Sequence, residues 1–166
     1  MSRFRVSPLQ AELDRSLFQS GSTPLDRYLR EQATQDIRRR VAACFVALQG
    51  TQIAGYYTLA SASVLLSDLP DLVTKKLPRY PTVPAIRMGR LAVDQSFKRQ
   101  GLGAALLADA LHRSLQSEIA AYALIVDAKD KSAAAFYQHH GFIALPDSPL
   151  QLFLPLATAE ALMRQP

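Results

Sequence analysis

The chain has 166 residues, of which 49% are hydrophobic and 20% charged, and this composition and length fit one soluble globular domain spanning residues 1–166. No apolar stretch approaches the roughly 20 residues that cross a bilayer, and the N-terminus lacks the apolar core of a signal peptide. We therefore expect a cytoplasmic protein. Cys44 is the only cysteine, and its apolar neighbours favour a buried, inert thiol over a nucleophile.

Hydrophobic periodicity and turn residues predict the order of the elements. Thr23 and Pro24 are typical of a helix start, with Thr23 as N-cap. Four prolines between residues 65 and 84 predict an extended loop. In chain order we expect a helix from 23 to 40, strands at 41–48 and 53–64, the loop, a strand at 86–93, a helix at 101–116, a strand at 123–127, a helix at 131–140, strands at 142–145 and 150–154, and a short helix at 157–163. This order predicts a mixed α/β sheet with one central crossover.

The net charge of +5 is unevenly placed along the chain. Residues 75–99 contain seven basic residues and one acidic residue, Asp94, which gives this stretch a charge of +6. A basic centre on a nearly neutral body favours an anionic ligand, which is a phosphate-bearing cofactor, a nucleic acid or both. A solvated basic surface without a ligand is the alternative interpretation.

The stretch GRLAVDQSFKRQGLGAALLADAL predicts a phosphate cradle. A strand ends, a basic turn follows, and Gly101 and Gly103 open a helix whose first amide groups have no partner within the helix. Lys98 and Arg99 add positive charge at its edge. The third glycine of a dinucleotide-binding loop and the Lys-Ser/Thr end of a nucleotide P-loop are both missing. From these residues alone, a helix that begins with glycines for purely structural reasons is as good an interpretation as a phosphate-binding site.

The stretch DAKDKSAAAFYQHHGF predicts a short helix with Asp130 as N-cap and Gly141 as its end. Phe136 shares a face with His140, whereas Tyr137 points about 100° away. We expect Phe136 to enter the core and Tyr137 to face a gap between neighbouring strands. A tyrosine that only covers the core is the alternative. Adjacent helical histidines point apart, so His139 and His140 predict a helix C-terminus and no metal site.

Taken together, these stretches resemble the GNAT N-acetyltransferases from about Val41 to Phe153, through the strand LAV, the turn KRQGLGA and the helix AxxFYxxxGF. The resemblance implies a sheet with splayed central parallel strands and acetyl-CoA as the cofactor. It implies Tyr137 as the catalytic residue beside the thiol sulfur. Asp130 stands where the family often has Asn, so that contact is not carried over. The cofactor-binding residues implied are Leu91, Ala92, Val93, Lys98, Arg99, Gln100, Gly101, Leu102, Gly103, Ala104 and Phe136.

The N-terminal half is similar to one branch, the acetyltransferase toxins of bacterial type II toxin–antitoxin pairs (the TacT and AtaT kind). The similar segments are TPLDRYLREQATQDIRRRVAACFVAL, IAGYYTLASASVLL and LPRYPTVPAIRMGRLAVD. The resemblance implies acetylation of the α-amino group of aminoacyl-tRNA, which blocks translation. It also implies a homodimer neutralised by a ribbon-helix-helix antitoxin, in a complex that represses its own operon through operator DNA. Candidate tRNA contacts are Arg38, Arg39, Arg40, Lys75, Lys76, Arg79, Arg87 and Arg90.

The sequence shows no obvious general base, although Glu118, Asp94 or a water chain remain open. Deprotonating a lysine amine at pH 7 costs about 4–5 kcal/mol, whereas an α-amine costs only about 1–1.5 kcal/mol. A site without a dedicated base therefore suits an α-amine. Two alternatives stay open: an acetyltransferase for a small amine or a protein N-terminus, and a non-catalytic module that binds CoA or an antitoxin. We expect the pocket for the aminoacyl group in the loop 65–84.

Overall fold

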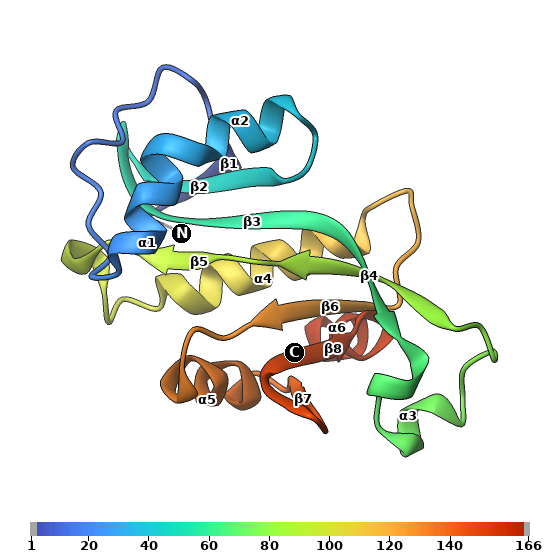
Figure 1. Cartoon of the computed structure of the whole chain (residues 1–166). Helices are drawn as coiled ribbons and strands as arrows, with labels where there is room; N and C mark the ends of the chain where they lie inside the picture. The colour runs from blue at the N-terminus through green and yellow to red at the C-terminus, as the bar shows by residue number, and fades with distance from the viewer. Residues whose placement is uncertain (1–2, 165–166) are drawn as a thin grey trace. The chain divides into compact units, whose positions relative to one another are not determined.

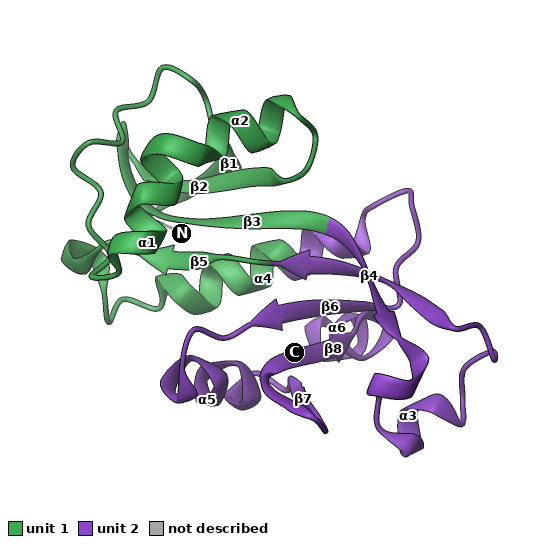
Figure 2. Ribbon diagram, viewed as in Figure 1, with its two compact units in different colours: residues 1–60, 89–110 green, residues 61–88, 111–166 purple. Residues whose placement is uncertain are grey.

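The computed structural model describes residues 3–164, and its elements group into two units (Figure 2). Unit 1 contains the described residues up to 60 together with 89–110, and unit 2 contains residues 61–88 and those from 111 onward. The chain therefore passes between the units after residues 60, 88 and 110.

Unit 1 is built on antiparallel strands, with β1, β2 and β3 as successive neighbours and β5 paired to the other edge of β3. Helices α1, η1 and α2 lie over one face of β1–β3 (Figure 1). The elements are β1 (Arg5–Pro8), α1 (Thr23–Arg27), η1 (Tyr28–Gln32), α2 (Ala33–Arg38), β2 (Ala43–Gln49), β3 (Gln52–Leu65, with its end in unit 2), β5 (Leu91–Val93), η3 (Gln95–Phe97) and α4 (Leu102–Leu115, with its end in unit 2).

The core of unit 1 follows from the alternation of side chains along its strands. Val46 and Tyr56 face the helical layer and pack against Leu29, which is fully buried. Gly55 faces the opposite way, toward Leu106 of α4. The sheet of unit 1 is therefore covered by helix on both faces.

Unit 2 carries the parallel strands of the fold. Strand β4 pairs in parallel with β6, and β8 pairs antiparallel with both β6 and β7. Helix α5 packs on β8, and α6 packs on β6 and β8. The elements are η2 (Leu66–Asp68), α3 (Asp71–Thr74), β4 (Thr82–Met88), β6 (Ala123–Asp127), α5 (Lys131–His139), β7 (Ile143–Leu145), β8 (Ser148–Pro155) and α6 (Leu156–Met163).

One face of the unit 2 sheet is closed by the segment that follows β3. Val83, Ile125 and Phe153 point from three neighbouring strands into one apolar cluster, which Leu69 covers. Strand β6 is buried through most of its length, so its sequence ALIVD shows no alternation.

The predicted mixed α/β fold is confirmed. The first part of the strand predicted at 86–93 belongs to β4, which pairs in parallel with the predicted strand 123–127. The proline-rich loop 65–84 contains only the short pieces η2 and α3, as expected. Asp130 caps α5 by accepting a hydrogen bond from Ala133 N (2.8 Å), and Gly141 follows the helix with a φ of 94°.

Three expectations about local structure are wrong. The strand predicted at 86–93 is interrupted at Gly89 and Arg90, where Thr58 N donates to the Arg90 carbonyl (3.1 Å). The first helix is capped by Ser22 instead of Thr23, because the Ser22 hydroxyl accepts from Leu25 N. That helix also contains the wider turn η1, and β1 was not predicted because four residues carry too little periodicity.

No helix within residues 3–164 is long and apolar enough to cross a membrane.

Replacing Gly55 by alanine is expected to destabilise the protein by about 1–3 kcal/mol. A Cβ there would lie 2.9 Å from the Ala92 carbonyl oxygen, and backbone cannot move aside as a side chain can. Gly89→Ala is the matched control, because its Cβ would meet only Thr58 Oγ1 at 3.6 Å. Urea unfolding of both variants measures the difference, and equal stabilities would contradict the packing of β3 against β5.

Candidate active site

The turn before α4 has the backbone geometry of an anion-binding site. Arg99 and Gly101 adopt left-handed conformations, with φ of 64° and 77°. The first hydrogen bond of α4 runs from Ala105 N to Gly101 O (3.0 Å). The amides of the three residues between them therefore have no acceptor within the helix. Backbone of this kind at the positive end of a helix dipole suits a phosphate.

Asp94 holds this turn from inside the protein. Its side chain is buried, with 5% of its surface exposed, and its two oxygens accept hydrogen bonds from Gln19 N and Ser96 N, both 2.9 Å. Asp94 N in turn donates to Ala54 O (2.8 Å). Both carboxylate oxygens are thus engaged by the protein backbone, which does not fit the general-base role left open for Asp94.

Other residues predicted in the cradle also have partners within unit 1. Lys98 Nζ donates to the Ser20 carbonyl (2.7 Å), so its charge anchors the N-terminal loop in addition to lying beside the turn. Gln100 Oε1 accepts from Arg3 Nη1 (3.0 Å). Arg99 is exposed. The cradle therefore offers mainly backbone amides and one exposed guanidinium to a ligand.

The short strand β5 leads into this turn. Leu91, Ala92 and Val93 pair with β3 through one edge, with Ala92 opposite Tyr56. In the part of the chain that the structure describes, β5 pairs with no strand other than β3. Its second edge can therefore form backbone hydrogen bonds with an extended ligand.

In unit 2, Tyr137 lies on α5 with only 5% of its surface exposed. Burial, and to a lesser degree the charge of Asp127, raise the pKa of its phenol above the usual value near 10. The hydroxyl has no hydrogen-bond partner among residues 3–164. It is also not among the fully buried polar atoms, so a ligand can reach it. Phe136 is only half-buried and contacts His140, so the expectation that Phe136 is the core residue is wrong.

A polar cluster that sequence reasoning missed lies at the end of β6. Asp127 forms an ion pair with Arg87 of β4 (Nη1 to Oδ2, 3.6 Å) and accepts a hydrogen bond from Gln151 of β8 (3.1 Å). Arg87 Nε is buried without a partner among the described residues. The available signal was an aspartate at the carboxyl end of a buried strand, where polar side chains of parallel sheets gather.

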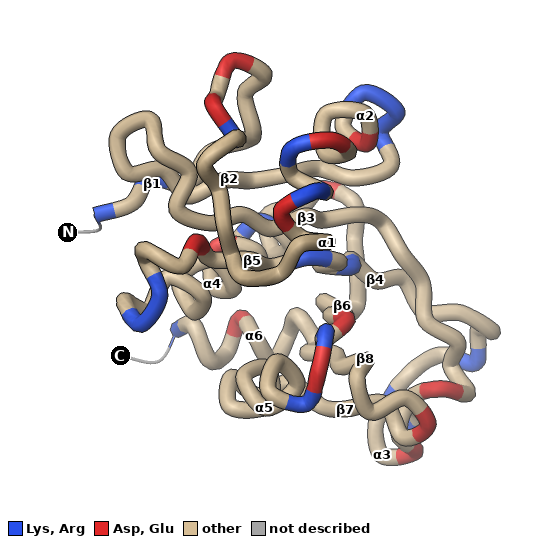
Figure 3. Tube along the Cα trace, turned by 60° about the vertical axis from the view of Figure 1, so that its left-hand side comes forward, with Lys and Arg blue, Asp and Glu red and all other residues tan. Residues whose placement is uncertain are grey.

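The candidate tRNA contacts fall into two groups. Arg87 and Arg90 interact with other residues of the protein. Arg87 forms an ion pair with Asp127, and the Arg90 guanidinium lies 3.6 Å from the centre of the Tyr28 ring. The remaining six are exposed on the surface, at the end of α2 in unit 1 and in the segment after α3 in unit 2 (Figure 3): Arg38, Arg39, Arg40, Lys75, Lys76 and Arg79.

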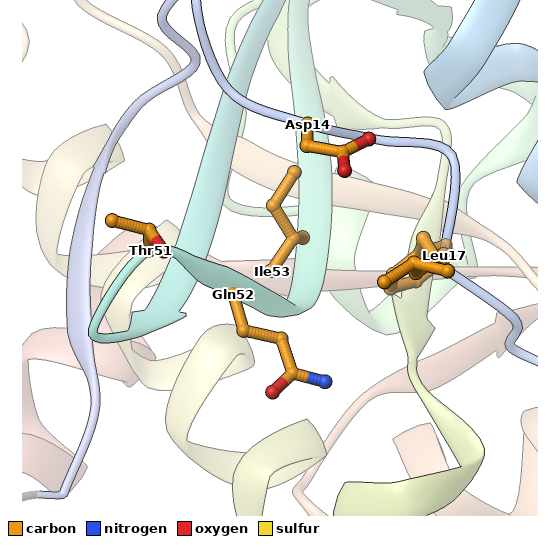
Figure 4. Close-up of a pocket in the computed structure, with 6 residues that line it drawn as sticks. Asp14, Leu17, Thr51, Gln52 and Ile53 are labelled. Carbon is orange, nitrogen blue, oxygen red and sulfur yellow. The ribbon is translucent and has the colours of Figure 1, made fainter.

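Each unit contains a pocket that is lined by described residues. The one in unit 1 has a volume of about 240 Å³ and lies between the loop with Asp14 and Leu17 and the β2–β3 turn (Figure 4). Its lining includes a carboxylate and no cation, which does not suit a phosphate group. The second, about 550 Å³, lies in unit 2 and is lined by residues 65–81, within the predicted loop.

No group of three or more histidine, cysteine or acidic side chains in residues 3–164 is arranged to hold a metal ion. Cys44 is buried, and burial raises the pKa of its thiol to about 12, so it is not a nucleophile at neutral pH.

Comparison with known proteins identifies the family, because a model described as an acetyltransferase (GNAT) domain matches residues 13–151. The chain belongs to the GNAT acetyltransferase family. A tRNA-acetylating toxin from Mycobacterium tuberculosis is 39% identical over 152 residues, which cover 90% of each chain. The resemblance to toxin acetyltransferases is therefore confirmed.

Two solved structures of GNAT toxins are similar over nearly the whole chain. A KacT mutant is 27% identical, with a TM-score of 0.90 and coverage of 97% of this chain and 99% of that one. AtaT complexed with acetyl-methionyl-tRNAfMet is 30% identical, with a TM-score of 0.86 and coverage of 96% and 99%.

Gly101→Ala is expected to destabilise this GNAT protein by about 1–2 kcal/mol, because an L-residue is strained in a left-handed conformation. A Cβ at Gly101 would meet no atom within 4 Å, so the cost arises from the backbone alone. Arg99→Gly should remain within about 1 kcal/mol of the parent, because relief of the same strain offsets the added chain entropy. Urea unfolding tests both, and an unaffected Gly101→Ala protein would contradict the turn geometry.

Proposed function

We propose that this chain is a toxin N-acetyltransferase that transfers acetyl from acetyl-CoA to the α-amino group of aminoacyl-tRNA and so blocks translation. The observation that carries the proposal is 39% identity to a tRNA-acetylating toxin over 90% of both chains. The similarity to AtaT in complex with an acetylated aminoacyl-tRNA supports the same substrate class.

The cradle fits the diphosphate of coenzyme A. The amides of residues 99–104 are assigned to the phosphate oxygens, with Arg99 supplying charge, because the helix start and two left-handed residues present these amides together. The backbone of Leu91, Ala92 and Val93 is assigned to the pantetheine arm. When bound, acetyl-CoA supplies an activated thioester.

Tyr137 is assigned the role of hydrogen-bond donor to the departing sulfur, and Phe136 lies beside it on α5. A phenol of ordinary pKa would transfer its proton to a thiolate of pKa ~8.5 at a cost of about 2 kcal/mol. The pKa of Tyr137 is raised by burial, so full transfer costs more than this. Tyr137 therefore stabilises the thiolate mainly by donating a strong hydrogen bond.

Neither of the two carboxylates considered as general base is well suited to that role, and this favours an α-amine as the acetyl acceptor. Asp94 is engaged by two amides, and Glu118 is exposed in the loop after α4. An α-amine with a pKa near 7.7–8 needs little assistance at neutral pH, whereas a lysine amine needs a strong base. Water can accept the proton from such an acceptor.

The partners proposed are a second copy of the chain, a ribbon-helix-helix antitoxin and, through the antitoxin complex, operator DNA, all in the cytoplasm. Support comes from relatives: an AtaT mutant is bound to the C-terminus of the antitoxin AtaR, and KacTA is found in a complex with DNA.

A cell-free translation reaction tests the proposed function. The full chain should arrest synthesis only when acetyl-CoA is present, and fresh aminoacyl-tRNA should restore it. Mass spectrometry of the tRNA should find N-acetyl-aminoacyl ends. Turnover of free amines without RNA would support a small-amine acetyltransferase instead, and binding without any turnover would support a regulatory module.

Tyr137→Phe is expected to lower turnover by roughly 10²–10⁴ while leaving the affinity for acetyl-CoA nearly intact. The ring and its packing against Phe142 are kept, and only the hydroxyl is lost. Initial rates and cofactor titration measure the two effects, with thermal unfolding as the control for folding. Unchanged turnover would remove Tyr137 from the chemistry.

The pH dependence of kcat/KM follows from the same assignments. The rate should rise as the substrate α-amine loses its proton near pH 7.7–8 and should not fall again up to pH 9. The raised pKa of Tyr137 keeps the phenol protonated over this range. Initial rates from pH 6 to 9 check this, and a decline above pH 8 that disappears in Tyr137→Phe would contradict it.

A further inference from the structure

The pocket in unit 2 is built from the end of β3 and the segment that leads to β4. It has a volume of about 550 Å³, within the roughly 300–1,000 Å³ range of small-ligand sites. Its lining combines apolar and polar residues: Leu65, Leu66, Ser67, Leu69, Asp71, Thr74, Arg79, Tyr80 and Pro81.

Three side chains of this pocket are free to bind a ligand. The side chains of Asp71, Arg79 and Tyr80 make no hydrogen bond or ion pair with any residue between 3 and 164, although the backbone carbonyl of Asp71 accepts from Thr74 Oγ1 and Lys75 N. Tyr80 has 69% of its surface exposed, so its ring is accessible to a ligand in this pocket. An exposed aromatic ring beside a guanidinium is the arrangement on which unpaired bases stack.

The charges around the pocket complement a nucleotide. Arg79 in the lining and the exposed Lys75 and Lys76 after α3 can neutralise backbone phosphates. The Asp71 carboxylate is an acceptor without a partner among the described residues, and it matches the exocyclic amino group that cytosine, adenine and guanine carry. Uracil has no such donor, so the lining favours bases that carry an amino group.

We propose that this pocket binds one unpaired nucleotide of RNA, with its base stacked on Tyr80, its amino edge on Asp71 and its phosphate on Arg79. The inference rests on the proposed function for the identity of the RNA, where the unpaired 3′ end of the acceptor strand is the matching segment. The pocket recognises the nucleotide itself, so binding does not require an attached amino acid.

Fluorescence anisotropy with short single-stranded oligoribonucleotides tests this on the full chain. Labelled oligomers of cytosine and adenine, with no amino acid attached, should bind more tightly than oligomers of uracil or a duplex. Tyr80→Ala should weaken binding by roughly 5- to 150-fold, the range of base–aromatic stacking, and Tyr80→Phe should restore it. Leu72→Ala is the matched control, because Leu72 is 77% exposed in the same segment and outside the pocket lining.

Two further variants separate the contributions of base and phosphate. Asp71→Asn should reduce the preference for cytosine and adenine over uracil while leaving binding to uracil oligomers unchanged. Arg79→Gln should weaken all oligomers alike and lower the slope of log affinity against log salt concentration by about 0.7.

Unchanged affinity in Tyr80→Ala, or binding that requires an aminoacylated oligomer, would overturn the proposal. So would a change of oligomeric state in Tyr80→Ala on gel filtration, because the pocket would then be covered by a second copy. The proposed function can fail independently of this proposal. If the parent protein acetylates no aminoacyl-tRNA but still binds the oligomers, and Tyr80→Ala loses that binding, the pocket assignment stands.

Discussion

One buried carboxylate fixes the turn on which the candidate cofactor site depends. Asp94 accepts hydrogen bonds from Gln19 and Ser96 and thereby joins the N-terminal loop to the end of β5. Lys98 strengthens the same junction through the Ser20 carbonyl. With the turn held at this end, Arg99 takes a left-handed conformation that a residue with a Cβ rarely adopts, and Gly101 takes one that only glycine adopts without strain. The amides at the head of α4 are therefore organised before any anion arrives, which lowers the entropic cost of binding it.

The elements that local signals determine could be predicted from the sequence, and those that distant pairing determines could not. Helix α4, helix α5 with its Asp130 cap and strand β6 are specified by their own periodicity and end residues. The interruption at Gly89 depends on how β3 pairs with the chain, and β1 depends on the presence of β2. The Asp127 cluster joins three strands that are distant in sequence, so no spacing rule reveals it. Tyr137 could be found from its motif, but its burial exceeds that of Phe136 because of packing that periodicity does not specify.

The basic stretch illustrates why net charge is a coarse guide to function. The sequence does not distinguish which of its cations are free to bind a ligand. In the structure, Arg90 lies over the Tyr28 ring, Arg87 pairs with Asp127, and Lys98 donates to the Ser20 carbonyl. What remains for an anionic partner is Arg99 at the cradle and the cations after α3, Lys75, Lys76 and Arg79. The two proposals assign these remaining cations to two sites with different ligands. The first suits a diphosphate held by amides, and the second suits an unpaired nucleotide held by an aromatic ring and a guanidinium.

These assignments share one physical requirement, which is that backbone amides before and within the first turn of α4 hold the cofactor and present its thioester to a protonated phenol. A crystal structure of the chain with acetyl-CoA measures this directly. We expect the diphosphate oxygens to lie about 2.7–3.2 Å from amides of residues 99–104, with the sulfur facing the Tyr137 hydroxyl. A diphosphate bound away from the head of α4, or a Tyr137 hydroxyl turned into the protein interior, would contradict the account.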